Sequence, residues 1–255
     1  MRILLTNDDG ILAPGLAALR SAVEDLGEVT VVAPDSPQSA TGRAITLTDP
    51  IVCERVHVGG EFWGYGVSGR PADCVKLAVR ELISDTPDLL LAGINPGANC
   101  GVNIFYSGTV AAAAEGAMMG ITSVAFSMAA GEELDFRRAA RLARAVLDVL
   151  LDVPVRPGEL INVNIPALSE RTPRGVKVAR QSTAAITESY ERQSVSGART
   201  VFRLNELYEH HPEETDNDVS AVAEGFIAVT PLHADLTDHR RCDRLGRLRW
   251  PPLDP

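Results

Sequence analysis

Short apolar runs alternate with amphipathic stretches through the first half of the chain. The runs Ile3–Leu5 and Val29–Ala33 have the length of buried strands, and leucine and valine recur between them at helical spacing. The alternation continues with strand patterns at Leu89–Ala92 and Ser123–Phe126, and helix patterns at about Pro71–Leu82, Thr109–Met119 and Phe136–Leu151. This order predicts an α/β protein with a Rossmann-like three-layer α/β/α arrangement, in which helices cover both faces of a mostly parallel sheet.

The pattern changes beyond Pro154, where helical periodicity largely disappears. Strand-like runs between polar links lie at Ile161–Ile165, Val176–Ala179, Val201–Leu204 and Phe226–Val229. We expect residues 1–155 to form the Rossmann-like core that carries the functional site, and residues 156–255 to form a strand- and β-hairpin-rich extension. Because isolated hairpins are marginally stable, the extension is expected to complete the fold and to contact another subunit. The arginine- and proline-rich tail from Arg240 onward is expected to be irregular.

Composition and charge narrow the class of protein. The chain has 255 residues, of which 45% are hydrophobic and 23% charged, as in an ordinary globular protein. A net charge of −10 argues against nucleic-acid polymers and anionic membranes as partners, since both require a basic surface. No apolar run reaches the ~20 residues of a membrane span and no secretory signal is visible, so a cytoplasmic protein is expected. The four cysteines form no C-x-x-C pair, which favours buried free thiols.

Two adjacent carboxylates, Asp8 and Asp9, follow the first predicted strand directly. In open α/β sheets, ligands bind outside the carboxyl ends of the strands, and two negative groups there need a compensating cation or solvent. From this segment alone a simple turn at Gly10, with one aspartate capping the next helix, is an equally good interpretation.

Three further polar segments also follow predicted strands. A hydroxyl-rich loop contains Ser39, an amide- and glycine-rich loop contains Asn95, and Ser107-Gly108-Thr109 opens an alanine-rich helix. Such a helix start can hold a phosphate through free N–H groups and the helix dipole, although alone it is more simply an N-cap. Each segment could be an ordinary turn, and only their shared position makes them a candidate site. The oxygen ligands Asp8, Asp9, Ser39 and Asn95 would suit a divalent cation such as Mg²⁺ or Mn²⁺.

Six sequence blocks occur together in an order that is far more specific than any one of them. They are ILLTNDDG, APDSPQSATG, GRPADCVKLA, PDLLLAGINPGAN, YSGTVAAAAEGA and ETDNDVSAVAEGFIAVTPL. In these blocks the chain resembles the SurE family of stationary-phase survival proteins, which are metal-dependent 5'/3'-nucleotidases. The resemblance implies a metal held by Asp8, Asp9, Ser39 and Asn95, and a homodimer or homotetramer with exchanged C-terminal hairpins. Arg70 stands where the family usually has threonine; it could contact substrate phosphate, but with no partner visible in the sequence a surface position is favoured.

These observations predict a phosphohydrolase that removes phosphate from nucleoside 5'- and 3'-monophosphates. Asp8, Asp9 and Asn95 are the expected catalytic residues, and Asn95 with Ser107, Gly108 and Thr109 is expected to bind the phosphate. A broad-specificity phosphatase or exopolyphosphatase is the enzymatic alternative. A second alternative is a non-catalytic nucleotide-binding oligomer. The G-x-G-x-x-G pattern of dinucleotide binding is missing after the first strand, which argues against a passive dinucleotide-binding module.

Overall fold

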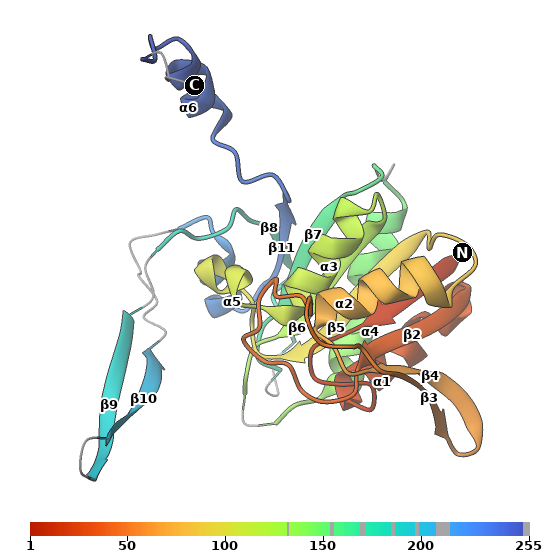
Figure 1. Ribbon diagram of the computed structural model, residues 1–255. Coiled ribbons are helices and arrows are strands. Elements are labelled where there is room, and N and C mark those ends of the chain that lie inside the picture. The colour runs from red at the N-terminus through yellow and green to blue at the C-terminus, as the bar shows by residue number, and fades with distance from the viewer. Residues whose placement is uncertain are drawn as a thin grey trace.

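The computed structural model describes residues 1–131, 133–153, 156–168, 172–184, 187–196, 199–207 and 215–251. Its centre is a nine-stranded sheet in the order β3-β4-β2-β1-β5-β6-β7-β11-β8 (Figure 1). Six of the eight strand pairings in this described sheet are parallel, and β3·β4 and β7·β11 are antiparallel. The strands are β1 (Arg2–Thr6), β2 (Glu28–Pro34), β3 (Cys53–Val58), β4 (Glu61–Val67), β5 (Leu89–Pro96), β6 (Thr122–Met128), β7 (Leu160–Ile165), β8 (Val176–Val178) and β11 (Ile227–Leu232).

Helices cover both faces of this sheet. Helices α1 and α4 pack together on one face, and α2 and α3 pack together on the other (Figure 1). The helices are α1 (Pro14–Val23), α2 (Pro71–Leu77), α3 (Gly108–Met118), α4 (Phe136–Leu151), α5 (Asp218–Ala223) and α6 (His239–Gly246). Shorter helical turns are the 3₁₀ segments η1 (Glu24–Leu26) and η3 (Gly101–Phe105), and the π turn η2 (Ala78–Leu82).

Each face of the sheet has its own hydrophobic core. Along β1, Ile3 and Leu5 pack into the core beneath α1 and α4, whereas Leu4 packs into the core beneath α2 and α3. Successive side chains of a strand point to opposite faces, so a strand covered on both sides is apolar at most positions. This explains the continuous apolar runs from which the strands were predicted, and the predicted Rossmann-like α/β fold is confirmed.

The hydrophobic pattern missed the two strands of the β3–β4 hairpin, strand β9 (Thr187–Ser196), and the helices α5 and α6. The β3–β4 hairpin at the edge of the sheet and the short helix α5 were not predicted, because neither carries a long periodic pattern. The prediction of an irregular tail was wrong, since α6 occupies part of it. The Asp238 side chain accepts a hydrogen bond from the Arg241 N–H at 2.9 Å, and this N-cap starts the helix.

The four cysteines are free, as predicted. Cys74 is buried, but Cys242 on α6 is exposed, so the expectation of buried thiols was wrong for that residue. Burial raises the pKa of the Cys53 thiol, which is partly exposed.

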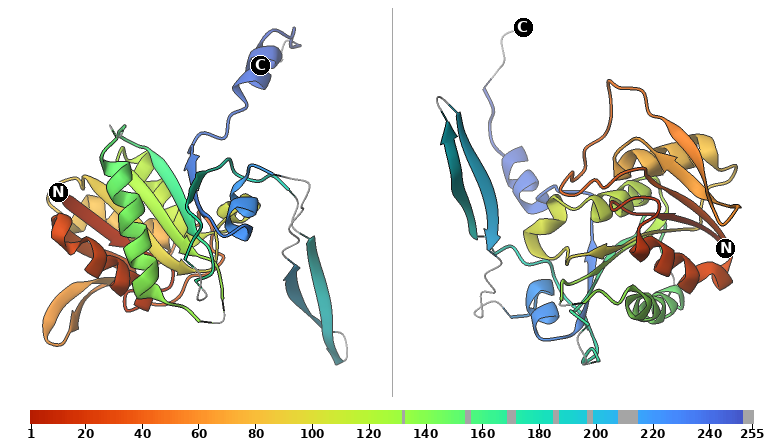
Figure 2. Two further views of the ribbon diagram at one scale, coloured as in Figure 1. Left: turned by 180° about the vertical axis from the view of Figure 1, so that it is seen from behind. Right: turned by 90° about the horizontal axis from the view of Figure 1, so that it is seen from below.

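Two arms extend from the body that the sheet and its helices form. One is the hairpin of β9 (Thr187–Ser196) and β10 (Arg199–Leu207), and the other is α6 (Figures 1 and 2). The same C-terminal half also supplies β7, β8 and β11 to the central sheet. The division of the chain at residue 155 stays a prediction, and the described sheet runs across it.

Close contact between α1 and β5 requires a glycine. A Cβ atom on Gly15 would lie 2.1 Å from the carbonyl oxygen of Ile94. We predict that Gly15→Ala lowers the free energy of unfolding by about 1–3 kcal/mol, because the helix or the strand must move. Denaturant unfolding would measure it. Gly246→Ala is the matched control in α6, where no heavy atom lies within 4 Å of the added Cβ. An equal loss of stability in both variants would contradict the prediction.

Candidate active site

The carboxyl ends of three neighbouring parallel strands bring the predicted site residues to one edge of the sheet. The central sheet places β1 between β2 and β5, with Thr6 of β1 paired to Ala92 of β5. Asp8 and Asp9 follow β1 directly, and Asn95 lies near the end of β5. Since parallel strands all end at the same edge, the two polar segments open toward the same region.

The loop that carries Ser39 is attached to the backbone of Asp8. The Gln38 N–H donates to the Asp8 carbonyl at 2.7 Å, and the Gly42 N–H donates to the Tyr106 carbonyl at 2.9 Å. These bonds hold the loop after β2 between the loop after β1 and the segment that leads into α3. Ser39 itself is exposed at this edge.

The start of α3 lies directly against Asp8. The Thr109 hydroxyl donates to Asp8 Oδ1. A Cβ atom on Gly108 would lie 2.7 Å from the Asp8 Cβ, so only glycine fits between the helix start and this carboxylate. Ser107 accepts a hydrogen bond from the Val110 N–H at 3.1 Å, so it is an N-cap, as the simpler interpretation of the sequence expected. Gly108 and Thr109 at the start of α3 therefore lie directly against the carboxylate of Asp8.

Both aspartates are held in an environment that disfavours their negative charge. Burial raises the pKa of Asp8, against the opposing effect of the Thr109 hydroxyl and nearby backbone groups. Burial, and then the charge of Asp8, raises the pKa of Asp9 to about 6. Within the described residues, no Lys, Arg or His lies within ion-pair distance of either carboxylate. A bound cation would supply the missing positive charge.

The neutral oxygens nearby suit the same kind of cation. The Asn95 amide nitrogen donates to the Gly97 carbonyl at 2.7 Å, and its amide oxygen accepts no hydrogen bond from the described residues. In the part of the chain that the structure describes, no three His, Cys, Asp or Glu side chains cluster as metal ligands. A site at Asp8 and Asp9 would therefore need neutral donors, and Ser39 and Asn95 are of the type that hard cations bind. Neither donor makes a hydrogen bond to the two aspartates among the described residues.

A buried amide network that the sequence analysis missed holds the loop between β5 and α3. The Asn99 N–H donates to the Asn164 side chain at 2.7 Å, and the Asn99 carbonyl accepts from the Asn162 side chain at 2.8 Å. The Asn99 amide nitrogen donates to Ser127 Oγ at 2.8 Å. Two asparagines in the buried strand β7 were the available signal, because polar residues inside a covered strand need partners.

Asp218 holds the same loop from the C-terminal part of the chain. Its carboxylate accepts hydrogen bonds from the N–H groups of Gly101, Ser182 and Val219, each at 2.9 Å. Burial raises the pKa of Asp218 against the effect of these three donors. Asp218 is 117 residues from Gly101 in the sequence, so no local pattern could have shown the contact.

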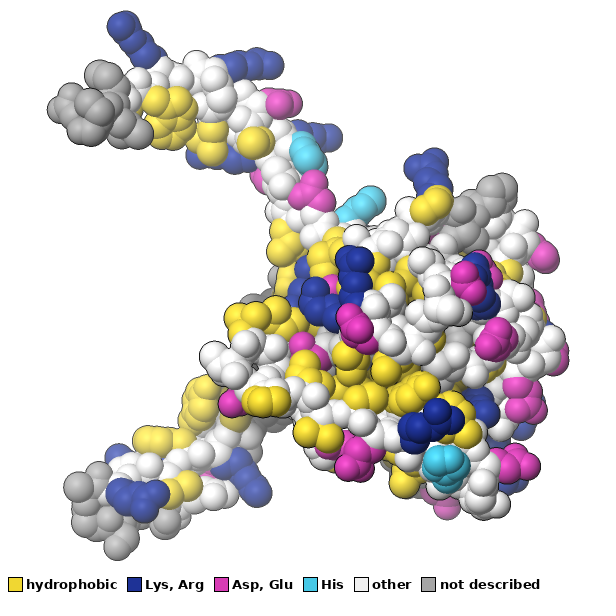
Figure 3. All heavy atoms as spheres, turned by 45° about the vertical axis from the view of Figure 1, so that its right-hand side comes forward, with side chains coloured by type: hydrophobic (Ala, Val, Ile, Leu, Met, Phe, Trp, Pro, Cys, Tyr) yellow, Lys and Arg dark blue, Asp and Glu magenta, His cyan; other side chains and the backbone are white. Residues whose placement is uncertain are grey.

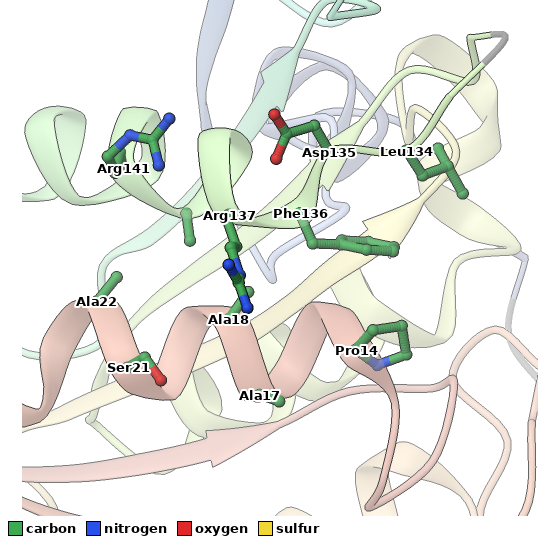
Figure 4. Close-up of a pocket in the computed structure, with 11 residues that line it drawn as sticks. Pro14, Ala17, Ala18, Ser21, Ala22, Leu134, Asp135, Phe136, Arg137 and Arg141 are labelled. Atoms are coloured by element: carbon green, nitrogen blue, oxygen red, sulfur yellow. The ribbon is translucent and has the colours of Figure 1, made fainter.

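A groove of about 710 Å³ lies elsewhere, between α1 and the N-terminal part of α4 (Figure 4). Its floor on α1 is made of small side chains, with Phe136 and Arg137 of α4 above them (Figure 4). The groove contains one carboxylate, Asp135, which already accepts a hydrogen bond from the Arg138 N–H at 2.9 Å. The groove lies on the face of the sheet that α1 and α4 cover, whereas Asp8 contacts α3 on the opposite face. None of the proposed site residues lines the groove, so the groove is separate from the Asp8 site.

Comparison with known proteins identifies close relatives over nearly the full length. The family model for survival protein SurE matches residues 3–188. A 5'-nucleotidase SurE of Syntrophobacter fumaroxidans is 43% identical over 247 residues, covering 97% of this chain and 99% of that protein. A 5'-nucleotidase SurE of Rhodopirellula baltica is 44% identical over 250 residues, covering 98% of each. The crystal structure of the SurE protein from Aquifex aeolicus has a TM-score of 0.84 at 36% identity, covering 96% of this chain and 98% of that one.

The raised pKa of Asp9 predicts a gain in stability when its charge is removed. Its pKa in the folded protein is about 6, against an ordinary value of 3.8, so Asp9 favours folding below pH ~4 and this contribution is lost as the pH rises through ~6. We therefore expect metal-free Asp9→Asn to unfold at a higher temperature than metal-free wild type at about pH 8, with the difference shrinking toward pH 4. Thermal unfolding in the presence of a chelator would measure this.

Adding Mn²⁺ provides the control for that comparison. A cation bound to Asp9 stabilises the wild type by mass action, so Mn²⁺ should raise the unfolding temperature of wild type more than that of Asp9→Asn. If the metal-free variant is less stable than metal-free wild type at about pH 8, the negative charge of Asp9 does not destabilise the folded protein, and the prediction is contradicted.

Proposed function

The chain belongs to the SurE family, and from that premise we propose that it is a 5'-nucleotidase that uses a divalent metal ion to hydrolyse nucleoside 5'-monophosphates. Activity toward 3'-monophosphates is part of the same proposal. The relatives named above carry the name 5'-nucleotidase over nearly the same length of chain, which supports this substrate class.

One observation of the structure carries the metal-dependent part of the proposal. The neighbouring carboxylates Asp8, which is buried, and Asp9, which is half-buried, have raised pKa values and no basic side chain within ion-pair distance in the described residues, and Asp8 lies against the N-terminal end of α3. This donor set fits a hard divalent cation such as Mg²⁺ or Mn²⁺. Asp8, Asp9, Ser39 and Asn95 would hold it, and when bound it would polarise the phosphoryl group and offset its developing charge.

The residues of the chain supply the remaining tasks. The N-terminal end of α3, at Ser107, Gly108 and Thr109, would bind phosphate oxygens through the positive end of its dipole and the backbone N–H groups of Gly108 and Thr109, since the Ser107 N–H already donates to the Asn103 carbonyl at 3.1 Å. Asn95, one of the four proposed ligands, would contact both the cation and the substrate. Thr109 also donates to Asp8 Oδ1 and so orients one carboxylate oxygen while the other stays available as a ligand.

We also propose that the protein works as a homodimer or homotetramer in which the two arms contact other copies. Figure 3 shows hydrophobic side chains on the surface of both arms. The large exposed ones are Tyr190, Phe202 and Leu204 on the hairpin, and Leu236, Leu248 and Trp250 on and around α6. A two-stranded hairpin and a short helix are each marginal in water, and large exposed apolar groups in both are typical of association surfaces.

None of the helices in the described part of the chain has both the length and the apolarity needed to cross a bilayer. The expected cytoplasmic location stays a prediction.

The activity test compares Asp8→Asn with wild type. We expect phosphate release from nucleoside 5'-monophosphates to require a divalent cation and to fall roughly a hundredfold or more in the variant, because one buried ligand loses its charge. Asp152→Asn, at the exposed end of α4, is the matched control and should keep wild-type activity. Release is measured with 5'- and 3'-monophosphates, p-nitrophenyl phosphate and polyphosphate, with and without Mg²⁺ or Mn²⁺.

The substrate ranking separates the alternatives. If the protein prefers p-nitrophenyl phosphate or polyphosphate to nucleotides, the proposed nucleotidase activity is replaced by that of a broad phosphatase or exopolyphosphatase. Nucleotide binding without phosphate release under any metal would leave a non-catalytic nucleotide-binding oligomer. Loss of hydrolysis in Asp8→Asn with unchanged metal occupancy would overturn the role of Asp8 as a ligand.

The role of the arms predicts a change of oligomeric state. Phe202→Asp combined with Leu236→Asp places one charge on each arm, and we expect the variant to elute as a smaller species in size-exclusion chromatography with light scattering. Val58→Asp is the control, since Val58 is exposed on the β3–β4 hairpin of the body. A wild-type protein that is monomeric at micromolar concentration would refute this part of the proposal.

A further inference from the structure

Arg70 lies at the edge of the candidate site, on a segment to which the proposed chemistry gives no task. It follows β4 and immediately precedes α2. Strand β4 is parallel to β2, with Val67 paired to Pro34, and the Asp35 N–H donates to the Val67 carbonyl at 2.9 Å. The carboxyl end of β4 therefore opens onto the same edge of the sheet as the aspartates.

Contacts on two sides place this segment against the site. The position that a Cβ of Gly108 would occupy is 3.1 Å from Pro71 Cγ and 2.9 Å from Asp8 Oδ2, so the start of α2 lies beside this carboxylate. On the other side, Arg70 Nη1 donates to Gln38 Oε1. The Gln38 N–H in turn donates to the Asp8 carbonyl at 2.7 Å. The guanidinium is thus directed toward the loop that carries the proposed metal ligand Ser39.

The backbone of Arg70 is held independently of its side chain. The Arg70 N–H donates to Asp73 Oδ2 at 2.9 Å. The Thr46 hydroxyl donates to the same oxygen at 2.8 Å, and Asp73 is buried. This carboxylate joins the loop after β2 to the start of α2, so a change of the Arg70 side chain leaves the anchoring bonds in place.

The guanidinium itself is available to a ligand. Arg70 is exposed, and within the described residues its side chain has one hydrogen-bond partner, the neutral amide of Gln38, and no carboxylate within ion-pair distance. A guanidinium carries five N–H donors in a planar fork that matches phosphate oxygens. In a chain of net charge −10, an arginine without a carboxylate partner at this edge opposes the overall repulsion of an anionic substrate.

We infer that Arg70 is a substrate-binding residue whose guanidinium donates to a non-bridging oxygen of the substrate phosphate, with Gln38 holding it at the mouth of the site. This inference rests on the proposed function and adds to it a residue that recognises the phosphate from the α2 side. The exposed position expected from the sequence is confirmed, but the arginine has a partner and lies beside the site.

The test measures KM and kcat of the full-length protein for a nucleoside 5'-monophosphate and for p-nitrophenyl phosphate. In Arg70→Gln we expect KM to rise roughly tenfold for both substrates with a much smaller change in kcat, since a charge-assisted hydrogen bond to the bound phosphate is lost. The inhibition constant of inorganic phosphate should rise by a similar factor. Arg70→Lys keeps the charge without the planar fork, so its KM should fall between those of Arg70→Gln and wild type.

Arg80→Gln is the matched control, because it removes the same charge from an exposed arginine on η2, which continues α2 away from the site. It should leave KM unchanged, and all variants should unfold at the wild-type temperature. An active wild type with unchanged KM in Arg70→Gln would overturn the inference alone. A rise of KM for the nucleotide only would also overturn it, since the contact would then be to the nucleoside. A wild type that releases no phosphate would overturn the proposed function and the inference together.

Discussion

The placement of two adjacent carboxylates just after β1, with Asp8 buried and Asp9 half-buried, is the constraint on which the rest of the site depends. Removing a carboxylate from water is unfavourable unless hydrogen bonds or opposite charges replace the lost solvent. The Thr109 hydroxyl and the start of α3 satisfy part of this requirement for Asp8. Asp9 has no such partner among the described residues, and its pKa of about 6 reflects both its burial and the charge beside it. The fold thus holds a pair of charges that a cation would stabilise, which is a common cost of building a functional site.

This constraint explains why α3 begins as it does. The close approach of Gly108 to Asp8 excludes a side chain at that position, and the alanine-rich helix that follows packs tightly on the sheet. A helix N-terminus placed beside a carboxylate is itself a favourable electrostatic arrangement. The same positive end would be available to the phosphate of a substrate, so one piece of backbone would serve both the resting structure and the proposed chemistry.

The C-terminal half contributes to the site without supplying any of the proposed ligands. Asn162 and Asn164 of β7, with Asp218 at the start of α5, hold the loop between β5 and α3 through buried hydrogen bonds. The low local dielectric strengthens each of these buried hydrogen bonds. One atom of the network, Asn162 Oδ1, has no hydrogen-bond partner among the described residues. The loop that precedes Ser107 is therefore positioned by residues that follow it by more than sixty positions in the chain.

The sequence by itself determined the alternation of strands and helices, because a strand covered on both faces is apolar at most positions and a covering helix is apolar on one side. It also predicted that Asp8, Ser39, Asn95 and Ser107 each follow a strand, whereas in the structure β5 extends to Pro96 and includes Asn95. Only the tertiary structure decided that Thr109 contacts Asp8, that Asp218 holds Gly101, and that Arg70 reaches Gln38. Among the elements that the pattern missed, the β3–β4 hairpin, α5 and α6 are short, and they depend on turns and caps rather than on a long repeat. Periodicity records which face of an element is buried, whereas contacts between distant loops depend on strand order and close packing, which no local pattern encodes.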